Sequence, residues 1–245
     1  MGFRFGVSGV RRDRLVALVT AFSGAALVAW LWAYNMGADG TGGAWDYYDT
    51  FIVGNILALF FLPIVVIIAM GEEPSDFGLA FADSRSVRLT AALLYIGLLV
   101  LLVPMSRVER FQDYYPLFKQ FNHYPIFDRY MHVHSFGEFA EHSIKALIYG
   151  WVSYGLYMFC WEFFFRGYLL FGMARTIGWS AVLVQSIAFG LLHWRKPMPE
   201  FLASFPAGII LGFLALKAKS FLPGFVLHWA AVITFDILVL LASKG

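Results

Sequence analysis

A carboxylate and a guanidinium lie four residues apart in the apolar stretch from Trp161 to Tyr168, which reads Trp-Glu-Phe-Phe-Phe-Arg-Gly-Tyr. Ionisable groups inside a membrane-length apolar segment are costly unless they are paired or face a polar cavity, so they are candidates for function. Positions i and i+4 share one face of a helix, so Glu162 and Arg166 can pair. Glu162 is therefore a candidate general base for water, with Arg166 holding it in place. The alternative is an ion pair that only fixes helix packing.

Two histidines follow in separate apolar segments. His193 ends the run Phe189-Gly-Leu-Leu-His, and His228 lies between Leu227 and Trp229. A lone histidine on an apolar face is more often a packed core residue, whereas two of them downstream of a Glu/Arg pair favour an active site. Asp236 is eight residues after His228, about 80° around a helix, where it can face the same cavity. A histidine with a carboxylate can polarise a scissile carbonyl or bind a metal.

Other polar groups carry weaker signals. Glu200 follows Pro197 and Pro199 near the start of a helix, where a glutamate ordinarily complements the helix dipole. The alternative role for Glu200 is an accessory carboxylate folded back over the site. His132 and His134 resemble part of a metal-binding patch, but the pattern is loose and solvated surface is the preferred interpretation.

Composition assigns the class of protein. Of 245 residues, 60% are hydrophobic and 14% are charged, and the mean hydropathy is +0.70. Soluble domains carry roughly a quarter charged residues, so this composition indicates a polytopic membrane protein. The net charge of +2 comes with no large basic cluster, which argues against a nucleic-acid partner. The single cysteine, Cys160, excludes an intrachain disulfide.

We expect one membrane-embedded domain over residues 1–245, an all-α bundle of about seven to eight transmembrane helices with its core motifs within 150–236. A helix needs about 20 apolar residues to span a bilayer. The expected spans are 15–34, 51–70, 89–105, a long run from 144 past 173 that needs a break or a protruding end, 179–194, 201–216 and 221–242. Small residues at Ala203-x-x-x-Ala207 and Gly208-x-x-x-Gly212 predict close helix packing there.

The basic N-terminus has two interpretations. Four arginines precede the first apolar stretch, as in a signal peptide, but that stretch exceeds the usual 7–15 residues, so we expect a retained helix. Residues 35–50 carry no Lys or Arg, whereas Arg85 and Arg88 follow the second span, which predicts a cytoplasmic N-terminus. Residues 106–142 are charged and aromatic, and they fit a loop, an interfacial helix or a short extra span.

Taken in order, these positions resemble the CPBP family of intramembrane proteases, which is related to the CAAX-prenyl endopeptidases and to bacteriocin-immunity proteins. The family pattern is Glu-Glu-x-x-x-Arg, then Phe-x-x-x-His, then His-x-x-x-Asn or Asp, on a bundle of about eight helices. Glu162-x-x-x-Arg166, Phe189-x-x-x-His193 and His228 match it. The supporting segments that also look like the family are 74–79 (Pro-Ser-Asp-Phe-Gly-Leu), 208–212 and 220–224.

The chain departs from that pattern at two positions. The first glutamate, to which the family's water-activating role is usually assigned, is Trp161 here, and the position four after His228 is Val232. The resemblance then implies one of two outcomes. Either Glu162 takes the role of base, with help from Glu200, or the chain binds a target without cutting it.

We expect an intramembrane endopeptidase in which Glu162 and His193 activate a water while His228, with Asp236 nearby, stabilises the oxyanion. No cofactor is required, and the alternative is zinc held by His193, His228 and Glu162. The rival function is a catalytically inactive membrane protein that binds a peptide or partner, as an immunity protein or scaffold. The resemblance further implies a membrane-associated peptide or protein substrate and a bacterial inner (plasma) membrane.

Overall fold

The computed structural model describes residues 7–36, 48–81, 84–117 and 144–243, and within these ranges the chain is all-helical, as predicted. Joined where they run on without a break, the elements of these ranges form eight helices, besides the short 3-10 helix η3 (Pro74–Phe77) before α4. The predicted histidine patch around His132 and His134 lies outside the described residues. The helices are α1 (Val7–Met36), α2 (Tyr48–Ile56) continued by the π-helix η2 (Leu57–Phe61) and α3 (Leu62–Ala69), α4 (Arg85–Met105), α5 (Glu109–Tyr114), α8 (Ile144–Glu162) continued by the π-helix η5 (Phe163–Leu169) and α9 (Leu170–Ile177), α10 (Ser180–Leu191), α11 (Met198–Ala218) and α12 (Leu222–Ala242).

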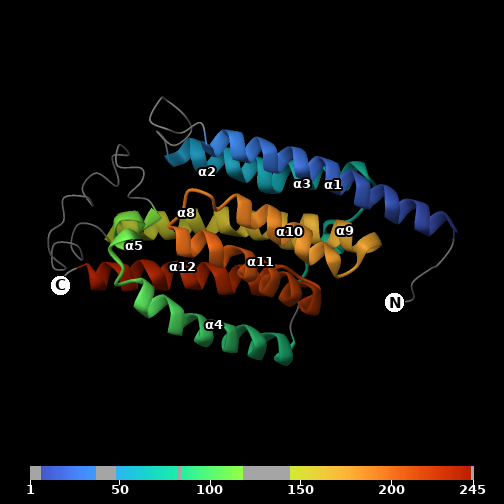
Figure 1. Cartoon of the computed structure of the whole chain (residues 1–245). Helices are drawn as coiled ribbons and strands as arrows, with labels where there is room; N and C mark the ends of the chain where they lie inside the picture. Colours follow the sequence, from blue (N-terminus) through green and yellow to red (C-terminus); the bar gives the residue numbers. More distant parts are fainter. Residues whose placement is uncertain (1–6, 37–47, 82–83, 118–143, 244–245) are drawn as a thin grey trace.

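The long helices lie side by side along one direction (Figure 1). Helix α1 and the α2–α3 pair cover one side, α8 to α12 form the middle, and α4 packs on α12 at the other side. Successive helices alternate in direction, so the turns before α4, after α9 and after α11 lie at the same end as the N-terminus (Figure 1). The start of α2 and the connection between α10 and α11 lie at the opposite end.

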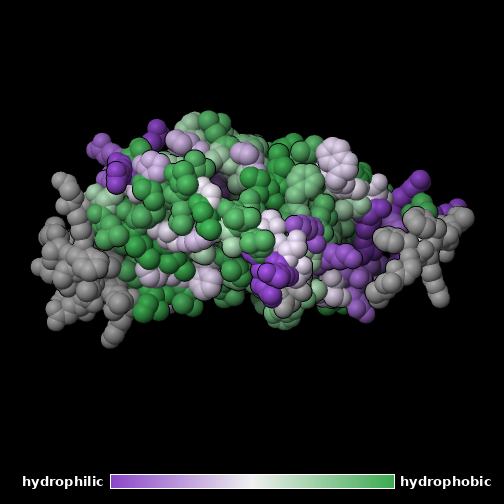
Figure 2. Space-filling model, turned by 90° about the horizontal axis from the view of Figure 1, so that it is seen from below, coloured by the Kyte–Doolittle hydropathy of each residue, from purple (hydrophilic) through white to green (hydrophobic). Residues whose placement is uncertain are grey.

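Among the described residues, five helices are long and apolar enough to cross a membrane: Gly9–Asn35, Tyr48–Ala69, Arg85–Met105, Met198–Ala218 and Leu222–Ala242. Each coincides with an expected span to within a few residues. Their outward faces carry exposed large apolar side chains such as Phe22 at 75% and Val100 at 72%. Figure 2 shows hydrophobic side chains over much of the middle of one face, with hydrophilic ones gathered mainly toward one end. Apolar side chains exposed in this density are stable in lipid and would aggregate in water, so the chain is an integral membrane protein.

The long run after residue 144 contains no interruption. Instead, the helix changes type immediately after Glu162, where η5 replaces the α-helical turn with a wider one. All residues of η5 are buried, Arg166 included. π-helical turns are rare and often lie at functional sites. The predicted break is therefore a change of helix type that occurs at the charged pair.

Ion pairs connect three segments at the end of the bundle where α1 begins. Glu72, in the turn after α3, accepts a hydrogen bond from Arg12 of α1 at 2.6 Å and pairs with Arg175 of α9 at 2.7 Å. Arg12 also donates to the carbonyl of Gly71, whose φ of 68° is in the left-handed region that glycine tolerates. Three segments far apart in sequence are thus tied together at this end.

Two of the supporting segments meet at the same end. Ser220 donates a hydrogen bond to the carbonyl of Ala80 at 2.5 Å, and the Phe221 N–H donates to the carbonyl of Gly78 at 3.3 Å. Residues 74–79 also pack directly under η5, because a methyl group at Gly167 would lie 2.8 Å from the Phe77 carbonyl oxygen. The early segment thus supports the helix that carries Arg166.

Small residues allow α10 and α11 to approach closely, but only one of the two predicted pairs does so. A methyl group at Gly208 would lie 3.0 Å from the Ser186 side chain, and one at Gly212 would lie 2.8 Å from Gln185. Ala203, by contrast, is exposed. Close packing at Ala203 was therefore predicted wrongly, because the residue faces outward from the bundle.

Candidate active site

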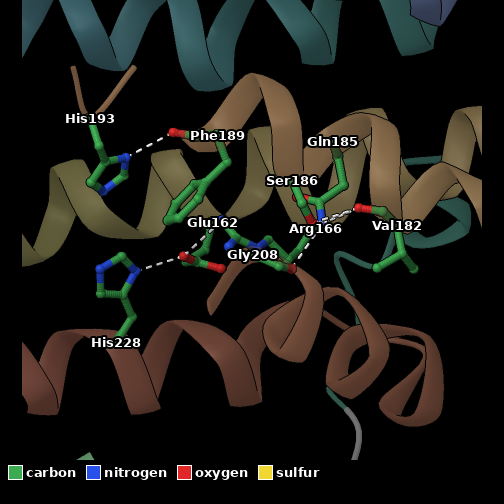
Figure 3. A network of polar contacts seen from close by, with 9 residues as sticks. All are labelled: Glu162, Arg166, Val182, Gln185, Ser186, Phe189, His193, Gly208 and His228. Atoms are coloured by element: carbon green, nitrogen blue, oxygen red, sulfur yellow. Dashed lines mark hydrogen bonds and ion pairs between the residues drawn. The ribbon is translucent and has the colours of Figure 1, made fainter. Parts of the chain in front are cut away.

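Glu162, Arg166 and His228 meet in the middle of the bundle. The Nδ1 of His228 lies 2.7 Å from Glu162 Oε1, and Arg166 Nη1 lies 3.2 Å from the same oxygen (Figure 3). The side chains of Glu162 and Arg166 are both 0% exposed. The helix ending at Glu162 and the π-turn after it place two members of this group, and α12 supplies the third. The predicted Glu162–Arg166 ion pair is present, and it includes a histidine from another helix.

The second oxygen of the buried carboxylate lies beside α12. A methyl group at Gly224, four residues before His228, would lie in ordinary contact with Glu162 Oε2, at 3.5 Å. That oxygen has no hydrogen-bond partner among the described residues. Burying an ion pair is expensive, and removing either partner leaves an uncompensated charge. The pair therefore needs the His228 contact as well as the guanidinium.

The guanidinium of Arg166 packs against the ring of Phe189. Its guanidinium carbon lies 3.9 Å from the centre of the Phe189 ring, within the range of a cation–π interaction. The ring of Phe189 lies in turn 4.4 Å from that of His193. Phe189 thus separates the guanidinium from the imidazole one helical turn further on.

His193 is fixed by the backbone and not by Glu162. Its Nδ1 lies 2.8 Å from the carbonyl oxygen of Phe189, so the N–H at this position donates to that carbonyl (Figure 3). This leaves Nε2 as the ring nitrogen with a lone pair. The expected partnership of Glu162 with His193 is not found, because the carboxylate turns toward α12.

A cavity of about 80 Å³ lies next to these groups. A single water needs only about 10–15 Å³ measured in this way, so several waters fit. His193 and His228 both border the cavity, but Glu162 does not. The other bordering residues are Trp32, Asn35, Phe51, Tyr114, Leu117, Tyr154, Tyr157, Met158, Trp161, Leu191, Leu192, Trp194, Arg195 and Lys196.

Trp161 forms part of the cavity wall. It is 4% exposed, and its ring lies 5.8 Å from that of His193 in an edge-to-face arrangement. Its indole nitrogen is enclosed by protein and has no hydrogen-bond partner among the described residues. The family's first glutamate is therefore replaced here by a packed aromatic ring beside the two histidines.

Asp236 lies apart from this group. Its Oδ2 accepts a hydrogen bond from the Trp151 indole at 2.9 Å. It borders a second cavity of about 10 Å³, together with Val232. The structure does not bring Asp236 together with His228, since the two lie two helical turns apart on α12 and the carboxylate turns toward α8.

Glu200 belongs to a network at the rim of the cavity. Both of its oxygens accept hydrogen bonds from the Tyr115 hydroxyl, at 2.7 and 2.6 Å, and Lys196 donates to Oε1 at 2.7 Å. Burial alone lowers the pKa of Lys196, but the Glu200 charge outweighs burial, so the pKa of Lys196 is above its ordinary value. Lys196 borders the cavity and Glu200 does not. Glu200 therefore neutralises a lysine at the mouth of the site.

The residues present do not fit the zinc alternative. The Nδ1 atoms of both histidines are bound within the protein, that of His228 by Glu162 and that of His193 by the Phe189 carbonyl, which leaves only their Nε2 atoms as possible ligands. In the part of the chain that the structure describes, no three His, Cys, Asp or Glu side chains are grouped as metal ligands. His193, His228 and Glu162 are thus not assembled as a zinc site, because the Glu162 carboxylate contacts Nδ1 of His228 and does not border the cavity.

Some residues near the site were not singled out from the sequence. Tyr154 and Tyr157 share one face of α8 with Trp161, at positions i, i+3 and i+7, and this spacing could have shown that they line the same space as Trp161. Gln185, which donates to the Gly208 carbonyl at 3.0 Å and joins α10 to α11, carried no such signal (Figure 3).

The fold and this site define a polytopic helical membrane protein with a buried Glu–Arg–His group beside a cavity. Residues 143–234 match the protein-family model described as Type II CAAX prenyl endopeptidase Rce1-like. No curated protein and no solved structure matches the chain. The match includes Glu162, Arg166, His193 and His228, while Asp236 lies beyond it. The resemblance to the CAAX protease-like family is therefore confirmed over this segment.

Proposed function

We propose that the protein is a membrane-embedded endopeptidase in which His228, held by Glu162, activates water. The observation that carries this proposal is the 2.7 Å contact between Glu162 Oε1 and His228 Nδ1, with His228 bordering a cavity large enough for water. A carboxylate that fixes one ring nitrogen while the other faces substrate is a recurrent device of hydrolases. Glu162 then acts through His228 and not on the water itself.

The protonation of His228 follows from its partner. A carboxylate paired with a guanidinium is ionised and only accepts hydrogen bonds, so Nδ1 of His228 carries the proton and donates. Nε2 then has a lone pair on the side of the ring away from Glu162 (Figure 3). This lone pair is available to take a proton from a water in the cavity.

The reaction then proceeds in two steps. His228 Nε2 takes a proton from water as the water oxygen bonds to the scissile carbonyl carbon, and the C=O π electrons move to the carbonyl oxygen. The resulting oxyanion re-forms the double bond, the C–N bond breaks, and the imidazolium returns its proton to the leaving amine. Glu162 stabilises the transient positive charge on His228, and Arg166 keeps the carboxylate ionised.

The remaining groups orient the reactants. The lone pair on Nε2 of His193 accepts the second hydrogen of the water, which fixes the direction of attack. The aromatic residues of the cavity, among them Trp161 and Tyr157, exclude bulk water and pack against an apolar peptide. Glu200 keeps Lys196 paired and so limits free charge at the rim.

We propose a membrane-associated peptide or protein as substrate and a bacterial inner membrane as the location. The arginines that precede the first span support a cytoplasmic N-terminus. Because the helices alternate in direction, the cavity residues at the start of α2 and in the connection between α10 and α11 would then lie in the outer half of the membrane. Substrates would present their cleavage site near that surface.

A second candidate function is binding without catalysis. The observation that favours it is Trp161, which puts an enclosed indole where the family has its first glutamate. In that case the Glu162–Arg166–His228 group only holds the helices together. The cavity would then recognise the backbone of a membrane-bound partner.

The test compares peptides from membranes and medium of cells that carry the wild type, Glu162→Gln or His228→Gln, with Glu73→Gln as the matched control. Glu73 is an exposed glutamate in the turn after α3, so its variant should give the wild-type profile. Loss of the same cleavage products from both site variants, at wild-type protein levels, supports the peptidase. Identical profiles in all four strains, in cells that need the protein for growth or resistance, support the binding protein.

A further inference from the structure

Tyr154 of α8 presents a polar group that nothing else in the site uses. Its side chain is 8% exposed, and it borders both the cavity of about 80 Å³ and the smaller one of about 10 Å³. Its hydroxyl makes no hydrogen bond within the described part of the chain. Unlike the indole nitrogen of Trp161, this hydroxyl is not fully enclosed by protein atoms, and Tyr154 is one of the residues that border the cavity. A buried hydroxyl without a partner is costly, which indicates a site where a ligand supplies the partner.

The position of Tyr154 relative to His228 follows from the packing of α8 on α12. A methyl group at Gly155, the next residue, would lie 2.5 Å from the ring of Trp229, so the two helices touch at this level. Tyr154 borders one cavity with His228 and the other with Val232, which is one turn after His228 on α12. The phenol therefore lies along the same face of α12 as the imidazole.

Hydrolysis of a peptide bond needs a donor at this place. When water adds to the carbonyl carbon, negative charge builds on the carbonyl oxygen, and hydrogen-bond donors fixed near that oxygen lower the barrier. The Nε2 atoms of His193 and His228 both act as acceptors in this site, so neither can supply that bond before proton transfer. Lys196 is already bound to Glu200 and Tyr115.

We propose that the Tyr154 hydroxyl donates a hydrogen bond to the carbonyl oxygen of the scissile peptide and stabilises the oxyanion; the inference rests on the peptidase function proposed above. Tyr154 is then a catalytic residue, since it touches a reacting atom. A phenol stays protonated at neutral pH and donates without losing its proton. The proposal also explains why the reaction needs no polar side chain at Val232.

Tyr157 is the rival donor in the same cavity, and its packing separates the two. Its ring lies 5.5 Å from Phe51 of α2 and 5.6 Å from Trp161, so it packs toward the other side of the bundle. Tyr157 thus borders the cavity away from α12. Removing its hydroxyl should affect peptide binding before it affects the chemical step.

The experiment uses the full-length protein in lipid bilayers with a quenched peptide that spans a cleavage site recovered from the cellular comparison. Tyr154→Phe keeps the ring and removes only the hydroxyl. The matched control is Tyr149→Phe, on the same helix, whose hydroxyl donates to Asp49 at the surface. We expect Tyr154→Phe to lower kcat by about 100- to 1,000-fold with little change in KM, as for other single oxyanion donors. The control should retain wild-type kcat.

A second readout separates the chemical role from a structural one. A peptide aldehyde forms a hydrate that resembles the tetrahedral intermediate, and Tyr154→Phe should weaken its inhibition by the same factor as kcat. The corresponding peptide amide, whose carbonyl carbon stays trigonal, should bind equally to both proteins. Wild-type kcat in Tyr154→Phe, or a loss equal for aldehyde and amide, overturns the role of Tyr154 while leaving the peptidase intact. Wild-type kcat in the His228→Gln protein overturns the proposed function itself.

Discussion

Trp161 and Glu162 are neighbours in the sequence but face different surroundings. Consecutive helical residues point about 100° apart, so the indole forms a wall of the cavity while the carboxylate is enclosed between Arg166 and His228. Water in the cavity can reach His228 but not Glu162. The carboxylate that the motif predicts as a base therefore contacts His228 and does not border the cavity.

Both the charge of Glu162 and the length of its side chain should be needed for its contact with His228. Glu162→Gln removes the charge that stabilises the His228 imidazolium, and Glu162→Asp withdraws the carboxylate by one methylene from a contact of 2.7 Å. We expect both to lower kcat by about 100-fold or more, the usual range for a general-base system. Steady-state kinetics in bilayers measures this. A fully active Glu162→Asp protein would show that the carboxylate is only structural.

Arg166 should be needed for folding more than for chemistry. Arg166→Met leaves Glu162 buried without its cation, which costs about 3–5 kcal/mol in the free energy of unfolding. The double variant Glu162→Gln, Arg166→Met removes both charges and should recover much of that loss. Reversible unfolding in mixed micelles compares the three proteins. A double variant no more stable than Arg166→Met alone would contradict the pairing.

Trp161 should stabilise the bundle by packing. Trp161→Ala leaves a void beside Phe165, whose ring lies 4.9 Å away, and should cost about 3–5 kcal/mol. Trp179→Ala is the matched control, because Trp179 is 62% exposed and makes little core contact. The same unfolding assay applies. An equal loss in both variants would show that Trp161 does not pack as a core residue.

The ion pairs at the N-terminal end should make stability depend on pH. Burial alone raises the pKa of Glu72, but hydrogen bonds and charge from Arg175 and Arg12 outweigh burial and lower it. Because the folded pKa is below the unfolded one, the stabilisation is complete above the unfolded value of about 4.3 and is lost as the pH falls through the folded value. Glu72→Gln should flatten the Tm profile in this acidic range. Glu73→Gln should leave it unchanged, and an unaltered profile in Glu72→Gln would remove Glu72 as its cause.

Chelators test the zinc alternative directly. Since no third ligand joins the two histidines among the described residues, we expect phenanthroline to leave kcat unchanged. A time-dependent loss of activity that zinc restores would show that the site rearranges around a metal. The Tyr149→Phe protein serves as an active reference.

The sequence was most informative where a single physical rule decides the outcome. The apolar runs gave the spans because about 20 such residues suffice to cross a bilayer, and the four-residue spacing gave the Glu162–Arg166 pair. It was least informative where two helices must be rotated relative to each other. The contact of Glu162 with His228 instead of His193, and of Asp236 with Trp151, depends on how α8 and α12 are turned, which no local pattern specifies.

The π-helical turn after Glu162 also sets the direction in which the side chains of α9 point relative to those of α8. A wide turn holds an extra residue, so every side chain beyond it is rotated by about 100° relative to an uninterrupted α-helix. Beyond this turn Arg175 lies 2.7 Å from Glu72, so the direction in which Arg175 points depends on the offset. Deleting one residue between Phe163 and Phe165 would keep a helix of nearly the same length and composition. It would nonetheless rotate α9, so that Arg175 no longer points at Glu72. The number of residues in this short segment is therefore constrained as well as their identity.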